Sequence, residues 1–111
     1  VHFGKLSASQ FVYNYFMWFV YLLFCDHTSF YIGITNDLPK RVGQHKNKLN
    51  KSTQEFNEID LVYCEKYNSK FEAAKREKQL KGWSKAKKQM LVNGKLGINT
   101  CTEFAEELLR G

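Results

Sequence analysis

The sequence predicts an α+β fold in which three β-strands are accompanied by helices. Two runs rich in β-forming residues, 18–25 and 30–35, are separated by the polar segment 26–29, a pattern typical of a β-hairpin. A third strand is expected at 59–63, and helical patterns follow the second and the third strand. The chain has 111 residues, of which 43% are hydrophobic, so it is long enough for one domain with a modest core.

The hairpin carries two tyrosines, Tyr21 and Tyr31, whose relative placement depends on the turn. Side chains alternate across a strand, so the two phenols share a face only if Tyr21 lies opposite Tyr31 or opposite Gly33. A two-residue turn at Asp26-His27 would put them on opposite faces. A common site therefore requires a connection of three or five residues.

A helix is expected directly after the hairpin. Asn36 or Asp37 can cap it, and Pro39 is tolerated in its first turn. Arg41 and His45 are spaced i, i+4, so they project from one side of this helix. Its apolar side is expected to hold Leu38, Val42 and Leu49. The lysine- and asparagine-rich segment 46–54 is predicted to be a helix end and a mobile loop that can rest on phosphates.

The third strand and the elements after it complete the predicted domain. Within the strand, alternation would place Leu61 and Tyr63 on one side and Asp60 and Val62 on the other. A helix is expected from Lys70 to Gly82. A last short helix would be capped by Ser84 and end at Asn93-Gly94.

Glu77 lies in an unexpected part of the 70–82 helix. Ala73, Glu77 and Leu80 are spaced i, i+4, i+7, so the carboxylate falls within the small and apolar stripe. One interpretation is an intrahelical ion pair with Lys81 or Lys78, which contributes a few tenths of a kcal/mol. The other is a functional carboxylate, such as a metal ligand.

The charge balance favours a polyanionic partner. The formal net charge is +6, from 17 Lys and Arg against 11 Asp and Glu, and phosphate contacts release counterions. Many small proteins carry such a surplus without binding nucleic acid, so the charge alone decides nothing. The candidate nucleic-acid-binding residues are Lys40, Arg41, Lys46, Lys48, Lys51 and Arg76.

The two ends of the chain are expected to lie outside the domain. Residues 1–16 precede Met17 and are interpreted as an N-terminal extension, not native to the domain or without fixed structure; residues 94–111 form an acidic tail. The apolar run 11–24 is shorter than the roughly 20 residues that span a bilayer, so no membrane contact is expected. The three cysteines are odd in number and include no Cys-x-x-Cys pair, which indicates neither a disulfide framework nor a zinc site and is compatible with the cytoplasm.

Taken together, these signals resemble the GIY-YIG nuclease superfamily over residues 17–93. The first triplet is Phe19-Val20-Tyr21 and the second is Tyr31-Ile32-Gly33; Arg41 follows ten residues after Tyr31, His45 lies one helical turn later, and Arg76-Glu77 lies on the next helix. Within the superfamily the chain looks most like the small single-domain bacterial UPF0213 group, relatives of the nuclease domain of the Slx1 structure-specific endonucleases.

The resemblance implies a fold and a chemistry. The fold would be a three-stranded antiparallel sheet flanked by helices, and the activity a metal-dependent DNA endonuclease that serves in DNA repair or recombination. Glu77 would hold one Mg²⁺ or Mn²⁺, and Tyr21 or Tyr31 would accept a proton from the attacking water. Arg41 would clamp the phosphate, and His45 would hydrogen-bond a phosphate oxygen or a tyrosine.

Two other functions stay open at this point. Phe19 replaces the glycine of the family's first triplet, and neither Gln89 nor Asn93 aligns securely with the family's final-helix asparagine. A catalytically degenerate module that only binds nucleic acid is therefore the main alternative. An adaptor that uses its aromatic and acidic ends is the other. Branched and single-stranded DNA are the substrate forms considered, and the oligomeric state is left open.

Overall fold

The computed structural model describes residues 17–94, so the N-terminal extension and nearly all of the acidic tail lie outside the described residues. The sheet has three strands in the order β2-β1-β3, and both pairs are antiparallel. The strands are β1 Trp18–Cys25, β2 Ser29–Thr35 and β3 Ile59–Tyr67. The helices are α2 Leu38–Lys46, α3 Lys70–Lys81 and α4 Lys85–Val92. The predicted α+β fold with a three-stranded antiparallel sheet is confirmed.

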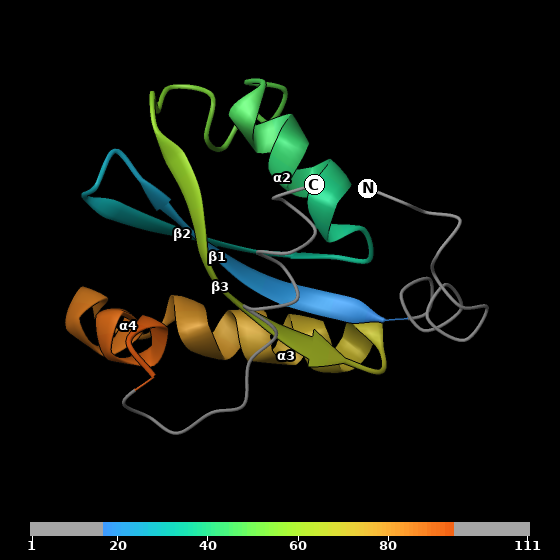
Figure 1. The fold of residues 1–111 in the computed structure, drawn as a ribbon. Coiled ribbons are helices and arrows are strands. Elements are labelled where there is room, and N and C mark those ends of the chain that lie inside the picture. Colours follow the sequence, from blue (N-terminus) through green and yellow to red (C-terminus); the bar gives the residue numbers. More distant parts are fainter. Residues whose placement is uncertain (1–16, 95–111) are drawn as a thin grey trace.

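The sheet lies between two helical layers, with α2 on one face and α3 and α4 on the other (Figure 1). The central strand β1 supplies both cores because its side chains alternate between the faces. On the α2 face the buried cluster includes Phe19, Tyr21, Leu23, Leu38 and Val42. On the α3 face it includes Val20, Leu22, Ala73, Leu80 and Leu91. No helix within residues 17–94 is long and apolar enough to cross a bilayer.

The hairpin has the three-residue connection that a common tyrosine site requires. Cys25 pairs with Ser29 and Tyr21 pairs with Gly33, so Tyr21 and Tyr31 project from the same face. The turn is made by Asp26 and His27, whose φ angles of 50° and 57° are left-handed. Polar residues such as Asp tolerate this conformation better than β-branched ones.

A bulge in β3 overturns the predicted alternation of its side chains. Leu61 pairs with Leu23, whereas Tyr63 pairs with Leu22, so Val62 is an extra residue between them. Leu61 therefore packs in the α2-face core and Tyr63 in the α3-face core, although the sequence predicted that both would share one side. The strand also continues to Tyr67, four residues beyond its predicted end.

The two ends of α2 show which residue caps the helix and that Leu49 lies outside it. Asp37, not Asn36, is the N-cap, and its carboxylate accepts from the backbone N–H of Lys40 at 3.2 Å. The helix ends at Lys46, and Lys48 takes a left-handed φ of 64°. Leu49 was expected on the apolar side, but it lies beyond the helix and is 73% exposed. Ser84 caps α4 as predicted.

A buried ion pair joins β3 to α3. The Glu65 side chain is 3% exposed and accepts from Arg76 at 2.9 Å and 3.0 Å. It also accepts from the hydroxyl of Tyr67 at 2.6 Å and from that of Tyr63. Burial alone would raise the pKa of Glu65, but the bonds from Arg76 and the two tyrosines lower it, so the carboxylate is ionised. The negative charge inside the protein is thus fully compensated.

On the α2 face the Tyr21 ring lies close against Gly33. A Cβ built on Gly33 would lie 2.5 Å from the Tyr21 hydroxyl and 2.6 Å from the ring carbon that carries it. The ring therefore lies directly over the backbone of the edge strand β2. Glycine is required here because any side chain would occupy the space of the phenol.

We predict that Arg76→Met lowers the free energy of unfolding by about 3 kcal/mol, because it leaves the Glu65 carboxylate buried without its cation. Urea denaturation followed by circular dichroism measures this. Lys75→Met, which changes the exposed neighbour on the same helix, is the matched control and should have little effect. Equal losses in the two variants would contradict the assigned role of the pair.

We also predict that Gly33→Ala destabilises the domain by about 1–3 kcal/mol, because the new methyl group must displace the buried Tyr21 ring. Gly43→Ala is the control. A Cβ on Gly43 meets nothing within 4 Å, and alanine in a helix is better than glycine by up to about 1 kcal/mol. Thermal unfolding should thus move in opposite directions in the two variants; a shift in the same direction would refute the close approach.

Candidate functional site

The centre of the candidate site is a hydrogen bond between a strand tyrosine and a helix histidine. The Tyr21 hydroxyl and His45 Nε2 are 2.9 Å apart, and both residues are 0% exposed. β1 directs Tyr21 toward α2, and the i, i+4 spacing from Arg41 places His45 at the last turn of that helix. Of the two partners expected for His45, a phosphate oxygen or a tyrosine, the structure shows the tyrosine.

The second ring nitrogen of His45 has a partner that was not predicted from the sequence. Nδ1 lies 2.7 Å from the hydroxyl oxygen of Thr53, which is also 0% exposed. Thr53 lies in the segment predicted to be a mobile loop, but its backbone is hydrogen-bonded to Asn50 at 3.2 Å and to Phe56 at 3.1 Å. A threonine among lysines and asparagines carries no signal for burial, so only the three-dimensional structure identifies it.

Tyr31 borders the same group from the edge strand. Its ring centroid lies 6.3 Å from that of Tyr21 and 5.0 Å from that of His45. Unlike Tyr21, it is only half-buried. The two predicted tyrosines and the histidine thus form one aromatic cluster, with Tyr31 as the member nearer to solvent.

Electrostatics connects Arg41 and Glu77 to the same phenol. Burial is the main reason that the pKa of Tyr21 is raised above 10, and the neighbouring Tyr31 adds to it. Arg41 lowers this pKa through its charge and a hydrogen bond, whereas the charge of Glu77 raises it. Burial and the Arg41 charge lower the pKa of His45, so its imidazole is neutral at pH 7. Groups from β2, α2 and α3 therefore act on the hydroxyl of Tyr21, which lies on β1.

Glu77 approaches from the other helical layer. α3 covers the sheet face opposite to α2 (Figure 1), and Glu77 is half-buried on it between the buried Ala73 and Leu80. The carboxylate side chain is 22% exposed and pairs with Lys81 at 3.4 Å. The intrahelical pair considered from the sequence is therefore present. Lys81 is exposed, and its distance from the carboxylate is long for an ion pair. The pair is therefore weak and leaves the Glu77 carboxylate available for other ligands.

The donor set around Glu77 suits a hard divalent cation. Mg²⁺ is commonly held by one or two carboxylates together with waters and phosphate oxygens, and it needs no complete protein cage. Glu77 is a single, partly buried carboxylate whose charge reaches the Tyr21 hydroxyl. These residues fit a shared protein–substrate metal site better than a closed structural one.

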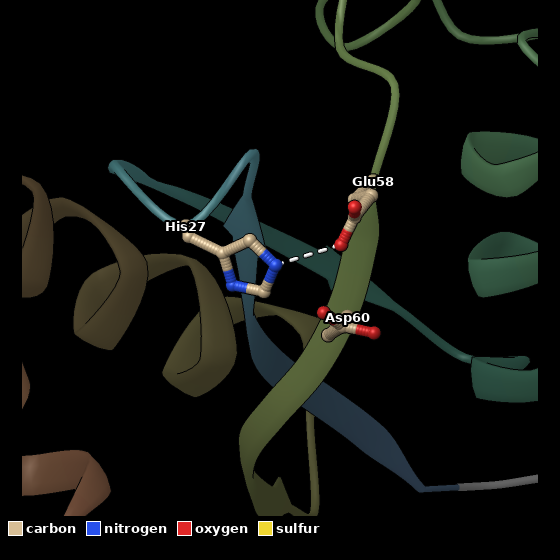
Figure 2. A group of neighbouring side chains, drawn as sticks. All are labelled: His27, Glu58 and Asp60. Carbon is tan, nitrogen blue, oxygen red and sulfur yellow. Dashed lines mark hydrogen bonds and ion pairs between the residues drawn. The ribbon is translucent and has the colours of Figure 1, made fainter.

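A different group of possible ligands lies at the tip of the hairpin. Figure 2 shows His27, Glu58 and Asp60, whose ligand atoms lie within 4.8 Å of one another. All three are exposed, and His27 Nε2 is 2.7 Å from the Glu58 carboxylate. A hollow of about 290 Å³ beside them is lined by Lys46 and residues 57–60. This group contains none of the predicted catalytic residues.

The predicted nucleic-acid-binding residues fall into two environments. The lysines at 40, 46, 48 and 51 are exposed on α2 and the segment after it, and Arg41 is half-buried beside Tyr21. Arg76 is different, because its side chain is 13% exposed and bound to Glu65. Its contacts give it a structural role, and its contact with nucleic acid stays a prediction from the sequence.

The chain is similar in sequence to a known family over most of its described residues. Residues 17–90 match the family model described as the GIY-YIG catalytic domain. A UPF0213 protein of Cronobacter sakazakii is 36% identical over 82 residues, which cover 73% of this chain and 86% of the relative. One from Natronomonas pharaonis is 35% identical over 80 residues, which cover 71% and 94%.

A solution NMR structure of a UPF0213 protein from Bacillus halodurans is also similar. It is 35% identical, covers 69% of this chain and 83% of its own, and superimposes with a TM-score of 0.46. The family match extends over both tyrosine triplets, the Arg41-His45 helix and Glu77. The chain therefore belongs to the GIY-YIG catalytic domain family, within the nuclease superfamily that this domain defines, and its relatives are UPF0213 proteins.

Proposed function

We propose that this chain is a metal-dependent endonuclease that hydrolyses phosphodiester bonds in DNA. The observation that carries the proposal is the Tyr21 hydroxyl, held at 2.9 Å from His45 and acted on by the charges of both Arg41 and Glu77. A hydroxyl with a proton acceptor at hydrogen-bond distance, which also responds to the charges of a guanidinium and a carboxylate, suits phosphodiester hydrolysis. Purely structural tyrosines rarely have such surroundings.

The two tyrosines take different parts in the proposed reaction. A phenol with a raised pKa is a poor base unless its own proton has somewhere to go. Tyr21 has such an acceptor in His45 Nε2, so Tyr21 accepts the proton of the attacking water as it passes its own to the imidazole. Tyr31 is half-buried beside it and borders the substrate. Because Tyr21 is buried, the substrate must open the surface above its hydroxyl.

In the proposed reaction, Arg41 and Glu77 act on the negative charge of the phosphate. The Arg41 guanidinium donates hydrogen bonds to the phosphate oxygens, where negative charge gathers in the transition state. Glu77 holds Mg²⁺ or Mn²⁺, which when bound would neutralise the scissile phosphate and lower the pKa of a bound water. The weak pair of Glu77 with Lys81 would be exchanged for the ion.

The exposed lysines of α2 and the following segment are the proposed track for the DNA backbone. Lys40, Lys46, Lys48 and Lys51 lie on the same layer as Arg41 and His45. Lysines contact phosphates without reading bases, so the expected binding is strongly salt-dependent and weakly sequence-specific. Branched or single-stranded DNA and a role in repair or recombination are the substrate and process we favour.

A nucleic-acid-binding module without catalysis is the second candidate, and the complete burial of Tyr21 favours it. Such a module would bind DNA with the same salt dependence, because the lysines are unchanged. It would cleave nothing with either metal. Metal-dependent cleavage and DNA binding are therefore measured on the same samples.

We predict that Glu77→Gln reduces Mg²⁺-dependent nicking of DNA by roughly 100-fold or more, because the amide cannot replace the charge that holds the cation. Glu72→Gln, an exposed glutamate on the same helix, is the matched control and should keep full activity. Chelation should abolish nicking in the wild type. Equal activity of the Glu77 variant and the wild type would rule out the proposed metal ligand.

We predict that Tyr21→Phe lowers the cleavage rate by about 100-fold or more at unchanged DNA affinity, because it removes the proton acceptor. Tyr31→Phe should cause a smaller loss. Single-turnover cleavage measures the rate and filter binding measures the affinity. A larger loss in the Tyr31 variant would transfer the base role to that residue.

A further inference from the structure

The hydrogens of the buried chain Tyr21–His45–Thr53 can be placed by elimination. The Tyr21 phenol keeps its proton at pH 7, since its pKa is raised. Among the described residues 17–94, the Tyr21 hydroxyl lies 2.9 Å from His45 Nε2 and is also acted on by Arg41, whose guanidinium has donors but no acceptor. Of these two, only His45 Nε2 can receive the phenol hydrogen, so Nε2 carries none of its own.

The same logic fixes the other side of the ring. His45 is neutral, because burial and Arg41 lower its pKa, and a neutral imidazole has one N–H and one bare nitrogen. With Nε2 bare, the hydrogen is on Nδ1, which lies 2.7 Å from the Thr53 hydroxyl oxygen. Nδ1–H therefore donates to Thr53.

We infer that Thr53 is a positioning residue: by accepting the Nδ1 hydrogen, it holds His45 in the tautomer whose bare Nε2 faces Tyr21. This inference rests on the proposed function for its catalytic meaning, but the tautomer itself does not depend on it. Second partners of histidines commonly fix ring orientation and tautomer in this way.

The proton step that this arrangement allows is balanced within the chain. The Tyr21 O–H bond breaks and its proton forms a bond to Nε2, so the phenol becomes a phenolate and His45 an imidazolium. The proton of the attacking water then replaces the one lost from Tyr21. Throughout, Nδ1–H stays bonded to Thr53, and in the opposite tautomer Nε2–H would block the transfer.

The test is the tautomer of His45 in Thr53→Val and Thr53→Ser, measured by long-range ¹H–¹⁵N NMR of the imidazoles. His2→Gln and His27→Gln assign the three histidine signals. Wild type and Thr53→Ser should show Nδ1–H. Thr53→Val, which keeps the shape but loses the oxygen, leaves Nδ1–H without its acceptor and only the Tyr21 hydrogen to favour this tautomer, so it should increase the share of His45 with Nε2–H. The control Ser52→Ala changes an exposed hydroxyl in the same segment and should leave the tautomer unchanged.

Cleavage by the same variants gives a second measurement. Thr53→Val should lose roughly 10- to 100-fold in rate, as for other second-partner substitutions, and Thr53→Ser should restore it. A wild-type His45 with Nε2–H, or an unshifted tautomer in Thr53→Val, would overturn the inference even if the valine variant folds poorly, since the wild-type measurement stands alone. If the tautomers behave as expected but the wild type never cleaves DNA, the nuclease proposal fails and the role of Thr53 is retained.

Discussion

The packing of the Tyr21 ring over Gly33 is the constraint on which the site depends. The absence of a side chain on Gly33 lets the Tyr21 ring lie close against the backbone of β2, with its hydroxyl at the end of α2. There it meets His45, which cannot move away because Thr53 holds its other nitrogen. A strand, an edge glycine, a helix and a loop residue are thereby fixed relative to one another within one buried group.

The two faces of the sheet carry different buried polar groups. The α2 face carries the hydrogen-bonded chain of Tyr21, His45 and Thr53, whereas the α3 face carries the compensated charge of Glu65 and Arg76. Arg76 directly precedes Glu77 in α3, so the ion pair that anchors the helix also limits where the Glu77 carboxylate can be.

Local sequence signals were sufficient to predict the strands and helices, and to predict which elements carry most residues of the candidate site. The β-forming runs gave both hairpin strands, and the i, i+4 spacing put Arg41 and His45 on one side of α2. Three features depended on long-range contacts instead. The bulge at Val62 follows from pairing with β1, the burial of Thr53 follows from its contact with His45, and the exposure of Leu49 follows from where α2 ends. Pairing register and loop packing leave no mark in a single sequence.

The three-residue turn of the hairpin has a consequence for how this protein can vary. Loops of small domains usually tolerate changes of length. Losing or gaining one residue here, however, would move the side chains of one strand to the opposite face of the sheet relative to its neighbour. Tyr31 would then leave the side on which Tyr21 lies. Natural variants of this domain should therefore lengthen or shorten the turn by an even number of residues, or compensate with a second bulge. The buried Tyr21 phenol thus restricts the length of an exposed turn.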